Sequence, residues 1–162
     1  MNRYDFNGAW ATMTRTTPQT CNSATTTQVL YNSGSQNTSG MINTSTGEIT
    51  IPTDGLYLIT AGVGFNGENT PVVSSYRWLQ IYLNASVISS GAVVRANDAS
   101  QSDTYLSDSN VWECSAGTVV SVSVHQNSGE NGVTPFAAAN GPFILGNVFT
   151  RFSVHQLHGK VM

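Results

Sequence analysis

Few residues in this chain could do chemistry, and most of them are far apart in the sequence. Asp98, Asp103 and Asp108 come closest to a metal-binding group, because they fall within one polar stretch over residues 95–110. They lack the dense alternation of oxygen ligands that a calcium loop uses. We therefore expect a solvated acidic loop there and no metal site.

The histidines do not predict a metal site either. His155 and His158 are three residues apart, which in an extended strand places them on opposite faces. A metal ion held by both is therefore not expected, and we interpret them as exposed polar residues. We expect His125 to lie on the outer face of its strand.

No catalytic motif is present, and we predict neither an enzyme nor a cofactor. The sequence has no Gly-x-Ser-x-Gly elbow, no phosphate-binding glycine loop and no His-Glu-x-x-His motif. Cys114 follows Glu113 and has no cationic neighbour in sequence that would lower its pKa. Two cysteines, Cys21 and Cys114, are too few for a disulfide framework, so we expect both to be reduced and partly buried.

The charge of the chain excludes several classes of partner. Only 9% of residues are charged, and the formal net charge is −3. The six Lys and Arg residues are scattered, whereas nucleic-acid binding needs them clustered. No run of apolar residues is long enough for a transmembrane helix or a signal peptide. We therefore expect no nucleic-acid partner, no membrane insertion and synthesis in a cytoplasm.

Composition and periodicity predict an all-β protein. Ser, Thr and Asn make up about a third of the chain and favour turns and exposed strand faces. In residues 118–125, Val120, Val122 and Val124 alternate with polar residues at the two-residue period of a strand. Eight to ten short runs of this kind, separated by turn formers, indicate a β-sandwich or jelly roll. Strand-like runs occur at residues 28–31, 47–52, 56–63, 77–83, 87–88, 93–94, 111–114, 118–125 and 147–157.

The first 27 residues are polar and rich in Thr, and two interpretations are open. They form either an extended arm that docks on a neighbour or a first strand followed by a loop, since the Thr alternation over residues 12–16 favours an extended chain. In the arm interpretation, an apolar set would make the contacts with the partner: Tyr4, Phe6, Trp10 and Met13.

Residues 47–59 resemble the signature of the C1q family. A strand begins at Gly47 and ends at Pro52, Gly55 allows a tight reversal, and the next strand places Tyr57 and Ile59 in the core. Three further stretches follow in the order expected of the family, at residues 78–84, 114–124 and 149–154. Arg151 stands where the family usually has Gly, the collagen stalk of the family is absent, and residues 1–27 match nothing in it.

This resemblance implies a ten-stranded C1q/TNF-like jelly roll over residues 28–162, preceded by an arm over residues 1–27. It also implies a homotrimer that assembles through an aromatic-rich face, with a monomeric sandwich as the alternative. The aromatic residues that we expect in the trimer interface or the core are Tyr57, Trp78, Tyr82, Phe149 and Phe152.

These features lead to three functional hypotheses, none of them enzymatic. The first is a bacteriophage virion protein, a trimeric decoration or stabilising protein on the capsid head that contacts the major capsid protein or another virion protein. The second is a receptor- or glycan-binding tip domain of a phage tail or a bacterial surface adhesin, for which trimeric multivalency would strengthen weak sugar contacts. The third is a secreted signalling ligand of the C1q/TNF type.

Overall fold

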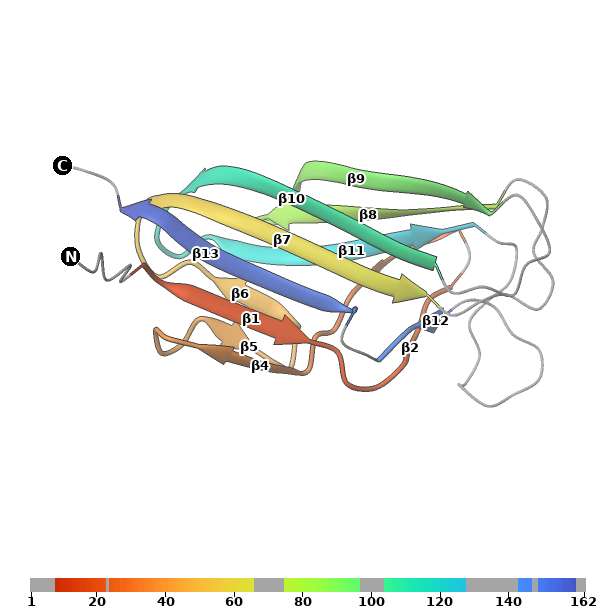
Figure 1. The fold of residues 1–162 in the computed structure, drawn as a ribbon, viewed down its shortest axis with the longest axis horizontal. Coiled ribbons are helices and arrows are strands. Elements are labelled where there is room, and N and C mark those ends of the chain that lie inside the picture. The colour runs from red at the N-terminus through yellow and green to blue at the C-terminus, as the bar shows by residue number, and fades with distance from the viewer. Residues whose placement is uncertain are drawn as a thin grey trace, which may run out of the picture.

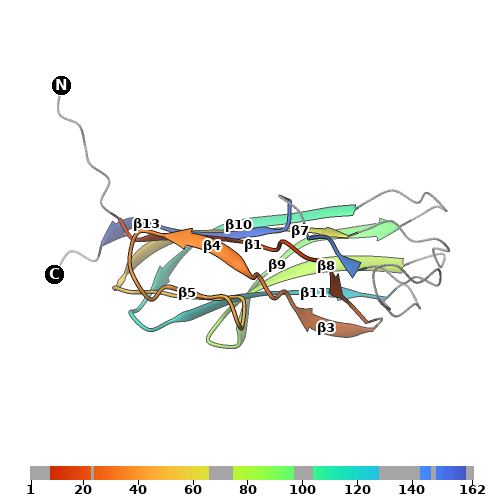
Figure 2. The same cartoon turned by 90° about the horizontal axis from the view of Figure 1, so that it is seen from below.

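The structure is a computed structural model, and it describes residues 8–22, 24–65, 75–96, 104–127, 143–146 and 149–159. Two antiparallel β-sheets lie face to face and form an elongated sandwich (Figures 1 and 2). The predicted all-β architecture is confirmed. No helix in these residues could cross a membrane.

The first sheet is built around β7, which pairs with β10 on one side and with β13 on the other. Strand β1 pairs with both β13 and β4, while β12 links β2 to the end of β7. The strands of this sheet are β1 (Trp10–Thr14), β2 (Gln19–Thr20), β4 (Ser33–Gln36), β7 (Gly55–Phe65), β10 (Thr104–Cys114), β12 (Phe143–Ile144) and β13 (Arg151–Gly159).

The second sheet is built around β11, which pairs with β8 on one side and with β3 and β6 on the other. Strand β9 pairs with β8, and β5 with β6. Its strands are β3 (Thr25–Gln28), β5 (Ile42–Asn43), β6 (Glu48–Thr50), β8 (Ser75–Leu83), β9 (Ser86–Ala96) and β11 (Val119–Gln126). The described residues thus form thirteen strands rather than the predicted ten, and β2, β5 and β12 are only two residues long.

The core lies between the sheets and follows the two-residue alternation of the strands. Val120, Val122 and Val124 are fully buried, as predicted, and they face Tyr57 and Ile59 of the other sheet in one continuous cluster. Burying a side chain of this size stabilises the fold by about 1.5–3 kcal/mol. The alternation in β7 and β11 therefore fixes which residues remain on the two outer faces.

The turn predicted from the C1q-like segment is present between β6 and β7. The strand ends before Pro52, and β7 begins at Gly55. The hydroxyl of Tyr57 donates a hydrogen bond to the backbone carbonyl of Thr53, with an O···O distance of 2.8 Å. Burial raises the pKa of the Tyr57 hydroxyl, which keeps it a donor.

The described part of the predicted N-terminal arm belongs to the sandwich instead. Residues Trp10–Thr14 form β1, which is paired on both sides, and Met13 is fully buried in the core. Met13 therefore cannot contact a partner from a free arm, and Trp10 is half-buried against His155. The open alternative, a first strand, is the one that the structure has. Tyr4 and Phe6 lie outside the described residues.

The described parts of the acidic loop predicted over residues 95–110, residues 95–96 and 104–110, lie in strands β9 and β10. Asp108 lies in β10, where its carboxylate accepts hydrogen bonds from the Ser89 hydroxyl and the Ser109 backbone. The bond from Ser89 connects β10 of the first sheet to β9 of the second. Asp98 and Asp103 lie outside the described residues.

Candidate functional site

The outer face of the first sheet carries an unusual number of apolar side chains. Among the described residues, seven large hydrophobic side chains are exposed, and five of them lie on β7, β10 or β13 or just before β13. We call these five the apolar face: Leu56, Tyr105, Val111, Phe149 and Leu157. Phe149 is 57% exposed and Val111 49% exposed. Large exposed apolar patches mark interaction surfaces on soluble proteins.

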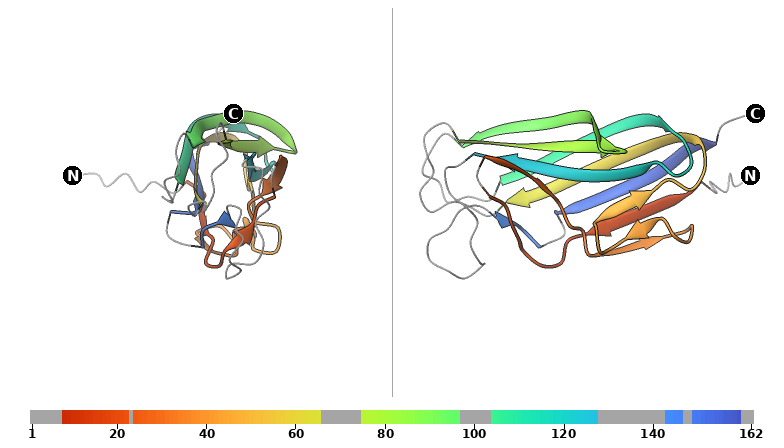
Figure 3. Two further views of the ribbon diagram at one scale, coloured as in Figure 1. Left: turned by 90° about the vertical axis from the view of Figure 1, so that its right-hand side faces the viewer. Right: turned by 180° about the vertical axis from the view of Figure 1, so that it is seen from behind.

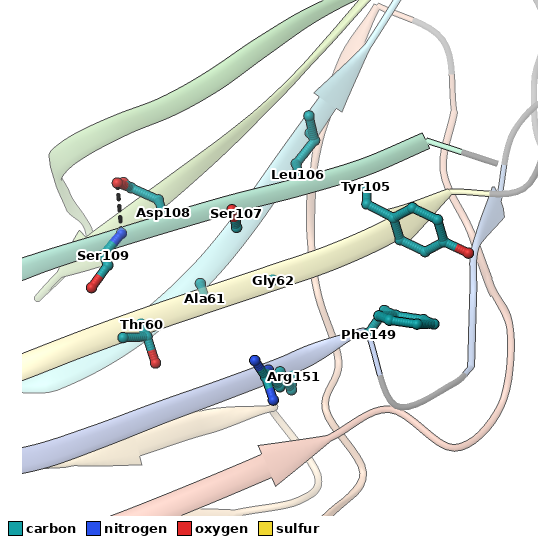
Figure 4. Close-up of a pocket in the computed structure, with 10 residues that line it drawn as sticks. All are labelled: Thr60, Ala61, Gly62, Tyr105, Leu106, Ser107, Asp108, Ser109, Phe149 and Arg151. Carbon is teal, nitrogen blue, oxygen red and sulfur yellow. Dashed lines mark hydrogen bonds between the residues drawn. The ribbon is translucent and has the colours of Figure 1, made fainter.

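A hollow of about 470 Å³ lies in this face, over the middle of β7 (Figure 4). Tyr105 and Phe149 stand on one side of it, and Arg151 lies nearby on β13. The Tyr105 and Phe149 rings are 4.8 Å apart between centroids and tilted by 55°. Tilted aromatic pairs of this kind are favourable and give a rigid rim.

Glycine at two outward positions of β7 makes the hollow possible. A Cβ on Gly64 would come within 2.9 Å of the Tyr105 ring, and a Cβ on Gly62 would come within 3.0 Å of the Phe149 carbonyl oxygen. With a larger residue at Gly64 the Tyr105 ring could not lie over the strand. The sequence showed these glycines, but their role depends on the pairing of β7 with β10, which sequence reasoning did not predict.

The outer face of the second sheet carries a separate aromatic cluster. Trp78 of β8 is directly opposite His125 of β11, and their ring centroids are 4.0 Å apart with an interplanar angle of 3°. Tyr76 stacks on Trp78 at 4.9 Å and 6°. Burial lowers the pKa of His125, so the ring is neutral at neutral pH. We call Tyr76, Trp78 and His125 the stacked cluster.

The aromatic residues predicted for the interface or core therefore separate into three places. Tyr57 and Phe152 are fully buried in the core, and Phe152 packs against Tyr31. Phe149 lies on the apolar face. Trp78 and Tyr82 lie half-buried on β8 of the second sheet. The two sheets form opposite layers of the sandwich (Figure 3).

Residues that could bind a metal or act as nucleophiles are not brought together in the described part of the chain. No group of three His, Cys, Asp or Glu side chains there could hold a metal ion. Cys21 and Cys114 are both buried and unpaired with each other, and burial raises the pKa of both thiols. A register shift at Gln156–His158 breaks the alternation on which the opposite-face prediction for His155 and His158 depended. The side chain of His158 lies outside the described residues.

Comparison with solved structures identifies the architecture. The globular domain of zebrafish complement 1qA is similar over 94% of this chain and 99% of that domain, with a TM-score of 0.59 and 12% sequence identity. The chain has a C1q/TNF-like jelly-roll fold. Crystal structures of murine APRIL at pH 5.0 and pH 8.0 are similar over 93% of this chain and all of theirs, each with a TM-score of 0.58, at 10% and 8% identity. No protein-family model and no curated protein matches the sequence.

Proposed function

We propose that this chain is a non-enzymatic module that assembles as a homotrimer through its apolar face. The observation that carries the proposal is the concentration of exposed apolar side chains on one sheet face, from Leu56 and Val111 at one end to Tyr105 and Phe149 at the other. A second copy that covered them would remove this surface from water, at about 25 cal/mol for each Å² of apolar area. The trimer implied by the C1q-like motifs supports a closed assembly over an open one.

The hollow gives the interface a defined shape. Its floor is the side-chain-free strip at Gly62, and its rim is the rigid pair Tyr105 and Phe149. A side chain from a second copy fits such a concave site better than a flat surface, and aromatic residues are enriched in the centres of interfaces. Arg151, exposed beside the hollow, would then need an acceptor on the neighbouring copy.

For the biological role, we propose decoration or stabilisation of a bacteriophage head. A trimer matches a threefold site on a shell, and a protein that binds only the assembled shell stabilises it by mass action. The supporting feature is compositional: 9% of residues are charged, and the chain is rich in Ser, Thr and Asn. Because Trp10–Thr14 is a strand, contact with the major capsid protein through the N-terminus would involve Tyr4 and Phe6 alone among the residues that sequence reasoning selected.

Immunogold electron microscopy of particles from the source culture tests this role. Label spread over the heads is the expected result. Absence of label from particles would contradict the virion role and leave the fold unaffected. A variant that lacks residues 1–7 keeps β1 intact and is expected to remain trimeric while losing particle occupancy; unchanged occupancy would exclude Tyr4 and Phe6 as the contacts.

The second candidate is a receptor- or glycan-binding module, and one observation favours it. The stacked cluster places three aromatic rings together on the face opposite the apolar face. In the same microscopy experiment, label confined to tail tips would favour this function over head decoration.

A further inference from the structure

We propose that the stacked cluster is a binding site for an uncharged saccharide, which stacks on the side of the Trp78 indole that Tyr76 and His125 leave uncovered. One face of a pyranose ring presents C–H groups, which are apolar and weakly positive. Such a face is complementary to the negative face of an aromatic ring.

The three ring distances show which side of the indole is uncovered. Tyr76 and His125 are both nearly parallel to Trp78, and their own centroids are 6.1 Å apart with an interplanar angle of 7°. If they lay on opposite faces of the indole, two stacking separations would place them about 7 Å apart or more. The measured distance is shorter, so both rings lie against the same face of Trp78. Neither ring covers the other face, and Trp78 is only half-buried.

The outward face of strand β8 suits an uncharged ligand. Strand β8 points Tyr76, Trp78, Gln80 and Tyr82 outward, and none of these carries a formal charge at neutral pH. The one basic residue of the described part of β8 that could compete, Arg77, points inward and is buried. The outward residues of β8 therefore offer no cation to an anionic ligand and no carboxylate to an ammonium ligand. On the neighbouring strand β9, Arg95 is the register partner of Tyr76, so the charged probes in the test below are essential comparisons.

Hydroxyl and amide groups flank the rings and could bind sugar hydroxyls. Gln80 accepts a hydrogen bond from the Tyr82 hydroxyl and lies next to Ser90 of β9. The Thr26 hydroxyl is 3.5 Å from Nδ1 of His125. The Nε1 donor of Trp78 is covered and makes no hydrogen bond within the chain, so the ligand would contact the ring face and not this donor.

The location of the cluster fits display on the outside of an assembly. It lies on the second sheet, in the layer opposite the first sheet (Figures 2 and 3). A trimer formed through the apolar face of the first sheet would therefore leave three copies of the cluster accessible. A single site of this kind, with one exposed ring face, is expected to bind weakly. Joint binding of several sites to one glycan-coated surface raises the overall affinity by about 10²–10⁴. Only this multivalency rests on the proposed trimer, because each site lies within one chain.

Ligand-observed saturation-transfer NMR with the full chain tests the site. The probes are maltotriose, cellotriose, N-acetylglucosamine trisaccharide and a β-galactoside disaccharide, with benzyltrimethylammonium and a sialyl-lactose as charged comparisons. We expect transfer to the C–H protons of at least one neutral saccharide. Transfer to none of the neutral saccharides, or to a charged probe alone, would overturn the proposal.

Two aromatic variants, one inside the cluster and one on the other sheet, locate the binding. Tyr76→Ser removes one of the rings that orient Trp78 and is expected to weaken binding at least tenfold. Trp10→Ser is the control, because it removes a half-buried ring that stacks on a histidine, His155, in the first sheet, and it is expected to leave Kd within twofold. Equal Kd values for Tyr76→Ser and the unmodified chain would contradict the site. If the chain is a monomer and binds a saccharide, the site is supported and the trimer is refuted. If the chain is a trimer and binds no saccharide, the trimer is supported and the site is refuted.

Discussion

Tyr105 and Phe149 are far apart in the sequence, yet their rings lie 4.8 Å apart on the surface of the first sheet. Both are exposed, and together they form the rim of the hollow over Gly62. Two large aromatic rings held in contact with one another while facing solvent are a typical feature of interfaces, where they act as rigid anchors.

Removing this pair should weaken self-association. The double variant Tyr105→Ala/Phe149→Ala loses the rim and much of the apolar area. We therefore expect its trimer to dissociate at protein concentrations 10- to 100-fold higher than those at which the unmodified trimer dissociates. Sedimentation velocity over a dilution series measures this. Leu30→Ala removes an exposed apolar side chain outside the apolar face and is the control. Equal dissociation by both variants would show that the rim has no particular role.

A steric test of the C1q-like segment is available at Gly47. This residue has a φ of 73°, and a Cβ there would lie 2.6 Å from the Tyr31 backbone nitrogen. Gly117 has a φ of 83° with open space around it. Both Gly→Ala changes incur about 1–2 kcal/mol of left-handed strain, but only Gly47→Ala adds a backbone clash. We expect thermal unfolding of Gly47→Ala at a clearly lower temperature than Gly117→Ala; similar midpoints would refute the clash.

The hydroxyl of Tyr57 should contribute measurably to stability. Tyr57→Phe keeps the buried ring but removes the donor to the Thr53 carbonyl, and a hydrogen bond of this kind contributes about 1 kcal/mol. For a chain of this size, that corresponds to a fall in Tm of roughly 2–4 °C. Tyr31→Phe is a useful comparison, because the Tyr31 hydroxyl makes only a long contact of 3.5 Å. A Tm unchanged by Tyr57→Phe would show that the turn is held without this bond.

Protonation of His125 should make the fold less stable at acidic pH. Burial lowers its pKa in the folded chain below the ordinary value of 6.5, so the unfolded chain binds a proton more readily. The contribution of His125 to the free energy of unfolding is complete above pH 6.5, and it is lost as the pH falls from 6.5 through the lowered pKa. Among the described residues it contacts Tyr76, Trp78 and Thr26, with no carboxylate to offset the charge. Thermal unfolding between pH 5 and pH 8 should show a smaller acid loss in His125→Gln; equal losses would contradict this assignment.

Local alternation predicted the core well because burial acts on individual residues. The valines of residues 120–124, together with Tyr57 and Ile59, read directly as inward-facing positions, and they are buried. The same reasoning applied to residues 10–14 would have found β1, since Ala11 and Met13 alternate with threonines. The threonines of this segment, which are expected to be exposed, favoured the arm interpretation instead. Polar residues on one face do not distinguish a free arm from a strand whose outer face is solvated.

The two surface sites depend on strand pairing, which the sequence does not display. Trp78 and His125 stack only because β8 and β11 pair in one particular register. The segment around Asp108 looked like a loop because residues 107–110 are all polar. In the structure Asp108 and Asn110 face β9 and hydrogen-bond with Ser89. A single-residue change of register would move all of these side chains to the other face. The pairing of strands that are far apart in the sequence is therefore the feature of the fold that the sequence did not predict.

Light scattering coupled to size-exclusion chromatography tests the central claim most directly. The unmodified chain should elute with three times its mass of 17.2 kDa. Val111→Glu places a charge in the apolar face and should yield the monomer. Val87→Glu, at a valine equally exposed (47% against 49%) but on the second sheet, should remain trimeric. A stable 17.2 kDa species for the unmodified chain, or an equal effect of both variants, would contradict assembly through the apolar face.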